Sequence, residues 1–172
     1  MMKGYLKWLA VISLPIILIV ISLLFLTDIF TPKSEVQLTV EESEQGAIFL
    51  IEEEKEVVEG EFTLDMSEAS IQRAIHLMSH QKVKADQKWG AIPLSPERVE
   101  RLLEIVQLNR DDYAHADVYE SILIRWSKQD FSRADHDHNA IWKLQNGTVG
   151  KATGLLTAEE EEAFIRKHFK SR

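Results

Sequence analysis

The sequence predicts a compact all-α bundle of about five helices, preceded by an N-terminal transmembrane helix and an acidic stalk. Three observations support this prediction: nineteen uncharged residues in a row near the start, a strongly acidic stretch after them, and apolar residues spaced three and four apart in the remainder. These features divide the 172 residues into an anchor over 1–34, a stalk over 35–65 and a helical domain over 66–172.

Residues 8–26 form the predicted membrane span. They contain no charged side chain, and at 1.5 Å per helical residue they match a hydrocarbon core of about 30 Å. We expect an uncleaved anchor rather than a signal peptide, because the apolar run is longer than a signal core and no pair of small residues follows at cleavage spacing. Lys3 and Lys7 precede the span, so the positive-inside rule places the N-terminus in the cytoplasm and the C-terminal domain outside the cell membrane.

Residues 35–65 carry the acidity of the chain. They hold eleven acidic residues against Lys55 alone, whereas the helical remainder has equal numbers of acidic and basic residues, so the net charge of -8 comes from this segment. Self-repulsion predicts an extended, solvated stalk. The alternation of apolar and polar residues over 36–40 and the apolar run 47–51 also predict brief strands or a hairpin within it.

Composition and motif spacing exclude several classes of protein. The absence of cysteine excludes disulfide scaffolds, Cys-ligated zinc and thiol nucleophiles. The acidic balance argues against binding of duplex nucleic acid, which begins with a basic surface. No serine lies in a Gly-x-Ser-x-Gly elbow. The glycines around Lys151 fail the spacing of a phosphate-binding loop.

Helix start signals and a period of 3.6 residues place the helices of the domain. Ser67, Ser95 and Thr157 stand at expected N-cap positions, the second followed by Pro96 and the third opening a capping box. Ser132 is the expected cap of the fourth helix. The five predicted helices cover about 68–80, 96–109, a third from a start between 113 and 116 to 128, 133–146 and 158–169.

Two groups of polar side chains are candidate metal ligands. His76 and His80 stand four apart on a predicted helix, which lets two imidazoles reach one metal, and they lie opposite its apolar stripe, where solvent or a partner reaches them. Asp135 and His136 complete the candidate site if the first and fourth helices are neighbours. The alternative is a pair of surface histidines, with His138 as a hydrogen-bonded core histidine.

Two turn-rich stretches, 89–93 and 147–154, are candidate docking surfaces. Their glycines allow positive φ angles, and the first stretch combines an aromatic side chain with a glycine and a proline that interrupt regular secondary structure. The alternative is that both are ordinary links between helices. The candidate partner-binding residues are Trp89, Gly90, Ile92, Pro93, Gly150, Lys151 and Gly154.

Segments 76–99 and 130–169 resemble an uncharacterised family of small proteins from spore-forming Gram-positive bacteria. The motifs that carry the resemblance are Met-Ser-His-Gln-Lys-Val, Lys-Trp-Gly, His-Asn-Ala-Ile-Trp and Gly-Lys-Ala-Thr-Gly-Leu-Leu. The resemblance covers about 66–170 and implies an N-terminal membrane anchor followed by a domain of this length. It implies no activity, cofactor or catalytic residue.

The leading functional hypothesis is a membrane-anchored extracytoplasmic helical module that holds an unidentified protein partner and needs no cofactor. The first alternative is a domain that binds zinc or another transition metal through the four candidate ligands. The second alternative is a hydrolase of envelope polymers, which requires a cleft with converging carboxylates.

Overall fold

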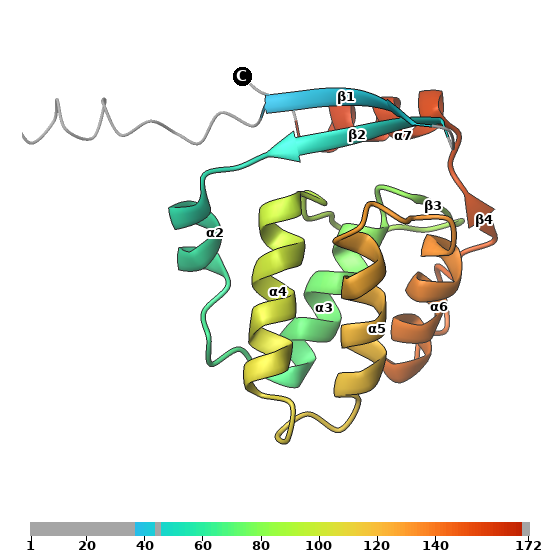
Figure 1. The fold of residues 1–172 in the computed structure, drawn as a ribbon. Helices are drawn as coiled ribbons and strands as arrows, with labels where there is room; N and C mark the ends of the chain where they lie inside the picture. The colour runs from blue at the N-terminus through green and yellow to red at the C-terminus, as the bar shows by residue number, and fades with distance from the viewer. Residues whose placement is uncertain (1–36, 44–45, 170–172) are drawn as a thin grey trace, which may run out of the picture. The chain divides into compact units, whose positions relative to one another are not determined.

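The structure, a computed structural model, describes residues 37–43 and 46–169. These residues form six helices, one β-hairpin and one short two-stranded ladder (Figure 1). The prediction of a mostly helical domain is therefore confirmed. The predicted span 8–26 lies outside the described residues. Among the residues that are described, no helix is both long enough and apolar enough to cross a bilayer.

The elements follow one another with short connections. β1 pairs with β2 as an antiparallel hairpin in which Gln37 is opposite Glu52, and β3 pairs with β4 with Val83 opposite Leu155. The elements are β1 (Gln37–Ser43), β2 (Gly46–Glu52), α2 (Lys55–Glu61), α3 (Glu68–Ser79), β3 (Val83–Lys84), α4 (Pro96–Leu108), α5 (Ala116–Trp126), α6 (Ala134–Leu144), β4 (Gly154–Leu155) and α7 (Ala158–His168).

The predicted helix starts agree with the structure at three of the four caps. The side chains of Ser67 and Ser95 accept hydrogen bonds from backbone N–H groups in the first turns of α3 and α4, and Thr157 forms a capping box with Glu160. α6 differs, because it starts after Arg133 without a side-chain cap. Ser132 instead donates to Asp130 and lies in the turn before the helix.

α3, α4, α5 and α6 enclose the main core (Figure 1). α4 packs against α5, and α3 packs against α6. Removal of large apolar side chains from water is the main stabilising contribution to such a bundle. The fully buried large apolar side chains of this core include Ile71, Ile75, Met78, Leu102, Ile105, Tyr119, Leu123, Trp126 and Ile141.

Residues 51–62 differ from the solvated stalk that the charge pattern predicted. Val58 and Phe62, from α2 and the residue after it, are buried in the main core, and Ile51 of β2 packs against Ile165 of α7. The apolar residues between the glutamates are buried against the helices of the bundle. The free energy gained by this burial outweighs the repulsion between the acidic side chains of the segment. The hairpin that the alternation allowed is present.

A buried ion-pair cluster ties this segment to the bundle. Arg98 of α4 donates from Nε to Glu53 Oε2 over 2.6 Å, and from Nη2 to Glu53 Oε1 over 2.9 Å and to Glu61 Oε2 over 2.7 Å. Ser95 Oγ donates to Glu53 Oε2 over 2.8 Å. The side chains of Arg98 and Glu53 are almost fully buried, so part of the acidity of the segment has a structural use.

Candidate functional site

The packing of α3 against α6 brings three histidines together. His76 and His80 come from α3, and His138 comes from α6. The ring centroids of His76 and His138 are 4.5 Å apart, those of His76 and His80 5.0 Å, and those of His80 and His138 5.6 Å. One ring nitrogen from each lies within 4.8 Å of the others. Within the described part of the chain, no other group of three or more histidine or acidic side chains converges in this way.

Two backbone carbonyls orient the buried members of this histidine cluster. His80 Nδ1 lies 2.8 Å from the carbonyl oxygen of Gly90, and His138 Nε2 lies 3.0 Å from that of Gly150. A carbonyl oxygen only accepts, so each of these nitrogens carries the ring proton. In the neutral rings, His80 Nε2 and His138 Nδ1 therefore keep a lone pair.

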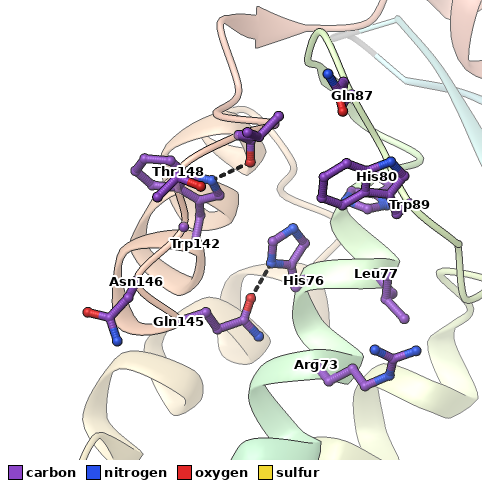
Figure 2. A pocket seen from close by; sticks show the side chains of 13 residues that line it. Arg73, His76, Leu77, His80, Gln87, Trp89, Trp142, Gln145, Asn146 and Thr148 are labelled. Atoms are coloured by element: carbon purple, nitrogen blue, oxygen red, sulfur yellow. Dashed lines mark hydrogen bonds between the residues drawn. The ribbon is translucent and has the colours of Figure 1, made fainter.

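His76 is held in the same manner by a side chain. Its Nδ1 lies 2.6 Å from Gln145 Oε1 (Figure 2), and its Nε2 has no hydrogen bond to any described residue. Ser79 Oγ donates to the backbone carbonyl oxygen of His76 over 2.5 Å, and it also lies 2.8 Å from His138 Nδ1. Each ring thus has one N–H committed to an oxygen of the protein, which is the arrangement that orients metal-ligating histidines.

The three rings are neutral at neutral pH. Burial lowers the pKa of both His80 and His138 to about 4. Burial also lowers the pKa of His76, and the nearby positive charge of Arg73 contributes in the same direction. Neutral imidazole is the form that binds a metal, so no proton has to be removed before these side chains can act as ligands.

Gly90 and Gly150 are glycines because of the backbone that presents these carbonyls. Their φ angles are +78° and +81°, a region that L side chains rarely adopt. A Cβ at Gly150 would also lie 2.6 Å from the backbone oxygen of Gln87. The two glycines allow their loops to turn a carbonyl toward a histidine.

α6 holds the loop over 147–153 in place. Trp142 Nε1 donates to the carbonyl of Val149 over 2.8 Å, and the side chain of Asn139 exchanges hydrogen bonds of 2.9 and 3.0 Å with the backbone of Ala152. Gly147 lies against the indole of Trp142, where a Cβ would come within 2.3 Å of the ring. The loop that carries Gly150 is therefore fixed to the helix that carries His138.

A pocket of about 450 Å³ opens over His76 and His80 (Figure 2). Trp89, which is 72% exposed, and the half-buried Trp142 contribute aromatic walls. Arg73 is the only charged side chain among the described residues that line it. The remaining polar side chains of the lining are those of Gln87, Gln145, Asn146 and Thr148.

The structure brings together only part of the predicted ligand set. His76 and His80 do converge, but the prediction that both are accessible is wrong for His80, which is 3% exposed because α6 and the loop of Gly90 cover that side of α3. Asp135 and His136 lie on α6 outside the histidine cluster, and His136 is exposed. His138 is a buried, hydrogen-bonded histidine as expected, and it is also the third member of the cluster.

Three of the seven predicted docking residues contribute to this site. Trp89 and Gly150 line the pocket, and the carbonyls of Gly90 and Gly150 orient histidines. Two features of the sequence pointed to these residues: Gly90 follows Trp89, and Gly150 lies in the turn-rich stretch 147–154. The sequence could not show that the carbonyls, rather than the side chains, face the site.

The other four predicted docking residues lie away from the pocket lining. Ile92 packs against the main core, and Gly154 pairs with Lys84 in the ladder of β3 and β4. Pro93 is half-buried, and Lys151 is exposed.

Comparison with known proteins identifies a family for this chain. The model of a family described as "Family of unknown function (DUF6241)" matches residues 75–166, which is more than half of the chain. The matched segment contains the histidine cluster and both loops that orient it. No curated protein and no solved structure matches the chain. The resemblance to an uncharacterised family is thereby confirmed, while its link to spore-forming bacteria and to a membrane anchor stays a prediction.

Proposed function

We propose that this chain, which belongs to the DUF6241 family of unknown function, binds a divalent transition metal such as zinc through His76, His80 and His138. The observation that supports this proposal is the state of the three rings. Each is neutral and donates one N–H to an oxygen of the protein. The other nitrogen of His76 and of His80 has no hydrogen-bond partner among the described residues, and that of His138 lies 2.8 Å from Ser79 Oγ. Ligating histidines in metal sites are held in this way by carbonyl and amide oxygens.

The spacing of the rings is close to that of a tetrahedral zinc site. Zn–N bonds of about 2.0–2.1 Å place tetrahedral ligand nitrogens about 3.4 Å apart. One nitrogen from each ring lies within 4.8 Å of the others, so closure by at most about 1.4 Å brings these three atoms to ligand spacing. His76 lies at the half-exposed side of the cluster, where its side chain has room to move.

A zinc titration of the full-length protein in detergent, with a chromophoric chelator as competitor, tests this proposal. We expect His76→Ala and His80→Ala each to weaken zinc binding by at least about tenfold, since even residues that only support a ligand cost that much. The matched control is His136→Ala, because His136 is exposed on α6 and lies outside the cluster. A wild-type protein that binds no zinc, or an equal loss in the control, would contradict the proposal.

The location of this domain is also a proposal. The uncharged run over 8–26 and the preceding Lys3 and Lys7 support a single-pass anchor with the domain on the outer side of the cell membrane. A reporter pair fused after Arg172, one active only in the cytoplasm and one only outside it, distinguishes the two orientations. Activity of the cytoplasmic reporter alone would contradict this topology.

A second candidate function is the docking of a protein partner at the rim of the pocket. Trp89 is 72% exposed and Val149 is 40% exposed there, and exposed aromatic side chains are common anchors in interfaces. A photo-crosslinker at position 89 in intact cells should then join the chain to one defined protein, whereas one at the exposed Leu108 of α4 should not. Equal labelling from both positions would contradict this function.

The hydrolase hypothesis stays a prediction, and the carboxylates that gather at a pocket are Glu59, Glu97, Glu100 and Glu104, at a separate pocket of about 160 Å³ between α2 and α4. A hydrolase of this kind needs two carboxylates facing one cleft. Within the described residues, no carboxylate lines the pocket over the histidine cluster.

A further inference from the structure

We propose that the pocket binds a small organic anion, whose carboxylate or phosphate group lies between the metal at the histidine cluster and the guanidinium of Arg73. This inference rests on the proposed metal site. It adds to that site a class of ligand, the organic anions, and a coordination position on the metal that the protein leaves open.

The first step of the argument is the number of protein ligands. Among the described residues, the cluster offers three ligand nitrogens and no additional acidic or histidine ligand. Zinc takes four ligands, and sites with three protein ligands leave one position to water or to an exchangeable ligand. His138 is fully buried, whereas His76 and His80 line the pocket, so the open position faces the pocket.

The second step is charge. Three neutral imidazoles leave the charge of a divalent metal uncompensated, and no acidic side chain among the described residues lines the pocket. Arg73 adds a further positive charge to the lining. A site with this balance attracts an anion.

The third step is the state of Arg73 itself. Its side chain is exposed on α3, one turn before Leu77 (Figure 2). No hydrogen bond or ion pair joins the side chain of Arg73 to another described residue. The arginines whose side chains do form such bonds there are Arg98, Arg101, Arg110, Arg125 and Arg166. Arg73 therefore has its guanidinium available for a ligand, and arginine binds carboxylate and phosphate groups in a two-point geometry.

The fourth step is size and lining. A volume of about 450 Å³ lies within the range of small-molecule sites and far exceeds the space of one water or one inorganic anion. Trp89 and Trp142 supply aromatic surface, and Gln87 and Asn146 supply amide groups. The lining thus suits an anion that carries an organic body, with the charged end toward the metal.

Cobalt(II) in place of zinc gives the experiment a visible signal. The full-length protein in detergent is first titrated with cobalt(II), whose absorption reports its coordination, and the loaded protein is then titrated with benzoate and with phenyl phosphate. We expect either or both anions to change the absorption band in a saturable manner. Arg73→Gln should weaken that anion binding by about tenfold, the loss typical of a hydrogen bond to a charged group. Arg133→Gln, at an exposed arginine before α6, is the matched control and should leave it unchanged.

The outcomes separate this inference from the metal proposal. If the protein takes up no cobalt(II), both are wrong. If cobalt(II) binds but neither anion changes the spectrum, or if Arg73→Gln binds the anions as tightly as the wild type, the anion site is wrong and the metal site stands. Saturable binding that is weakened in Arg73→Gln and not in Arg133→Gln supports the inference.

Discussion

Two of the buried polar clusters in the described part of the chain differ in how completely their polar atoms are satisfied. Around Arg98, the guanidinium charge is matched by Glu53 and Glu61, and only Nη1 of Arg98 lacks a partner. In the histidine cluster, the rings carry no charge, and two of them keep a ring nitrogen without a hydrogen bond to any described residue. The side chains of Arg98 and Glu53 are buried, with Glu61 at the solvent-exposed edge of their cluster, whereas the histidine cluster faces a pocket.

This difference separates a structural role from a candidate functional one. A buried charge is costly unless it is paired, so the glutamates that match Arg98 hold the hairpin and α2 on the bundle. A buried imidazole can be neutral, so it can hold an unused lone pair at low cost until a ligand arrives. The predictions below test this division between the two clusters.

The largest effect is expected at Arg98. Arg98→Met leaves Glu53 buried without its cation, which should lower the free energy of unfolding by about 3–5 kcal/mol. Denaturant titration measures this loss, and zinc binding should be retained under native conditions. Arg166→Met on the surface of α7, which breaks the exposed pair with Glu162, is the control and should cost less than about 1 kcal/mol. A loss at Arg98 as small as in the control would contradict a structural role for this cluster.

Zinc should stabilise the protein through the other cluster. At a free zinc concentration of about one hundred times Kd, binding to the folded state alone raises the free energy of unfolding by about 2.7 kcal/mol. Thermal unfolding with and without zinc measures this shift, and His80→Ala should remove most of it. An equal shift in the variant would place the zinc elsewhere in the chain.

Gly150→Ala should have an intermediate effect. The positive φ and the close approach to the oxygen of Gln87 predict a loss of about 1–3 kcal/mol in the free energy of unfolding, together with weaker zinc binding because the carbonyl that orients His138 moves. Gly60→Ala in α2 is the matched control. A Cβ there meets nothing within 4 Å, and alanine should stabilise the helix by about 0.4–1 kcal/mol. A neutral Gly150→Ala variant would contradict the proposed role of that carbonyl.

The smallest effect is expected from the pH dependence of Glu68. Burial by itself raises the pKa of this carboxyl group, but hydrogen bonds from Tyr119 Oη and from the backbone N–H groups of Ala114 and His115 outweigh it, and the pKa lies below its ordinary value of 4.5. The stabilisation from Glu68 is thus present above about pH 4.5 and is lost as the pH falls through the lowered pKa.

Glu68→Gln should therefore flatten this part of the pH profile of stability. Unfolding measured from about pH 3 to pH 7 in the wild type and the variant isolates the contribution of the group. Parallel profiles would show that the hydrogen bonds to Glu68 do not stabilise its ionised form.

Helices α3 to α7 could be predicted from the sequence because their signals are local, whereas α2 lies in the segment predicted to be a stalk. Caps at Ser67, Ser95 and Thr157 and apolar spacing depend on residues within one or two turns. The packing of Val58 and Phe62 could not be predicted, because the acidic composition of their segment dominates any local measure, while their burial depends on surface supplied by distant helices.

The candidate site shows the same limit. His76 and His80 are paired by helical spacing and could be found in the sequence. The choice of His138 over Asp135 and His136 depends on the rotation of α6 against α3 and on carbonyls from two loops, which no local pattern encodes. A histidine on the inner face of one helix, together with a histidine pair on another, is the signal that would have pointed to it.

X-ray absorption at the zinc edge of the zinc-loaded full-length protein tests the central claim most directly. The account predicts three imidazole nitrogens at about 2.0–2.1 Å and one further light-atom ligand from solvent or an anion. The number of imidazoles should fall by one in His76→Ala and stay at three in His136→Ala. A first shell dominated by carboxylate oxygens, or an imidazole count unchanged in His76→Ala, would contradict it.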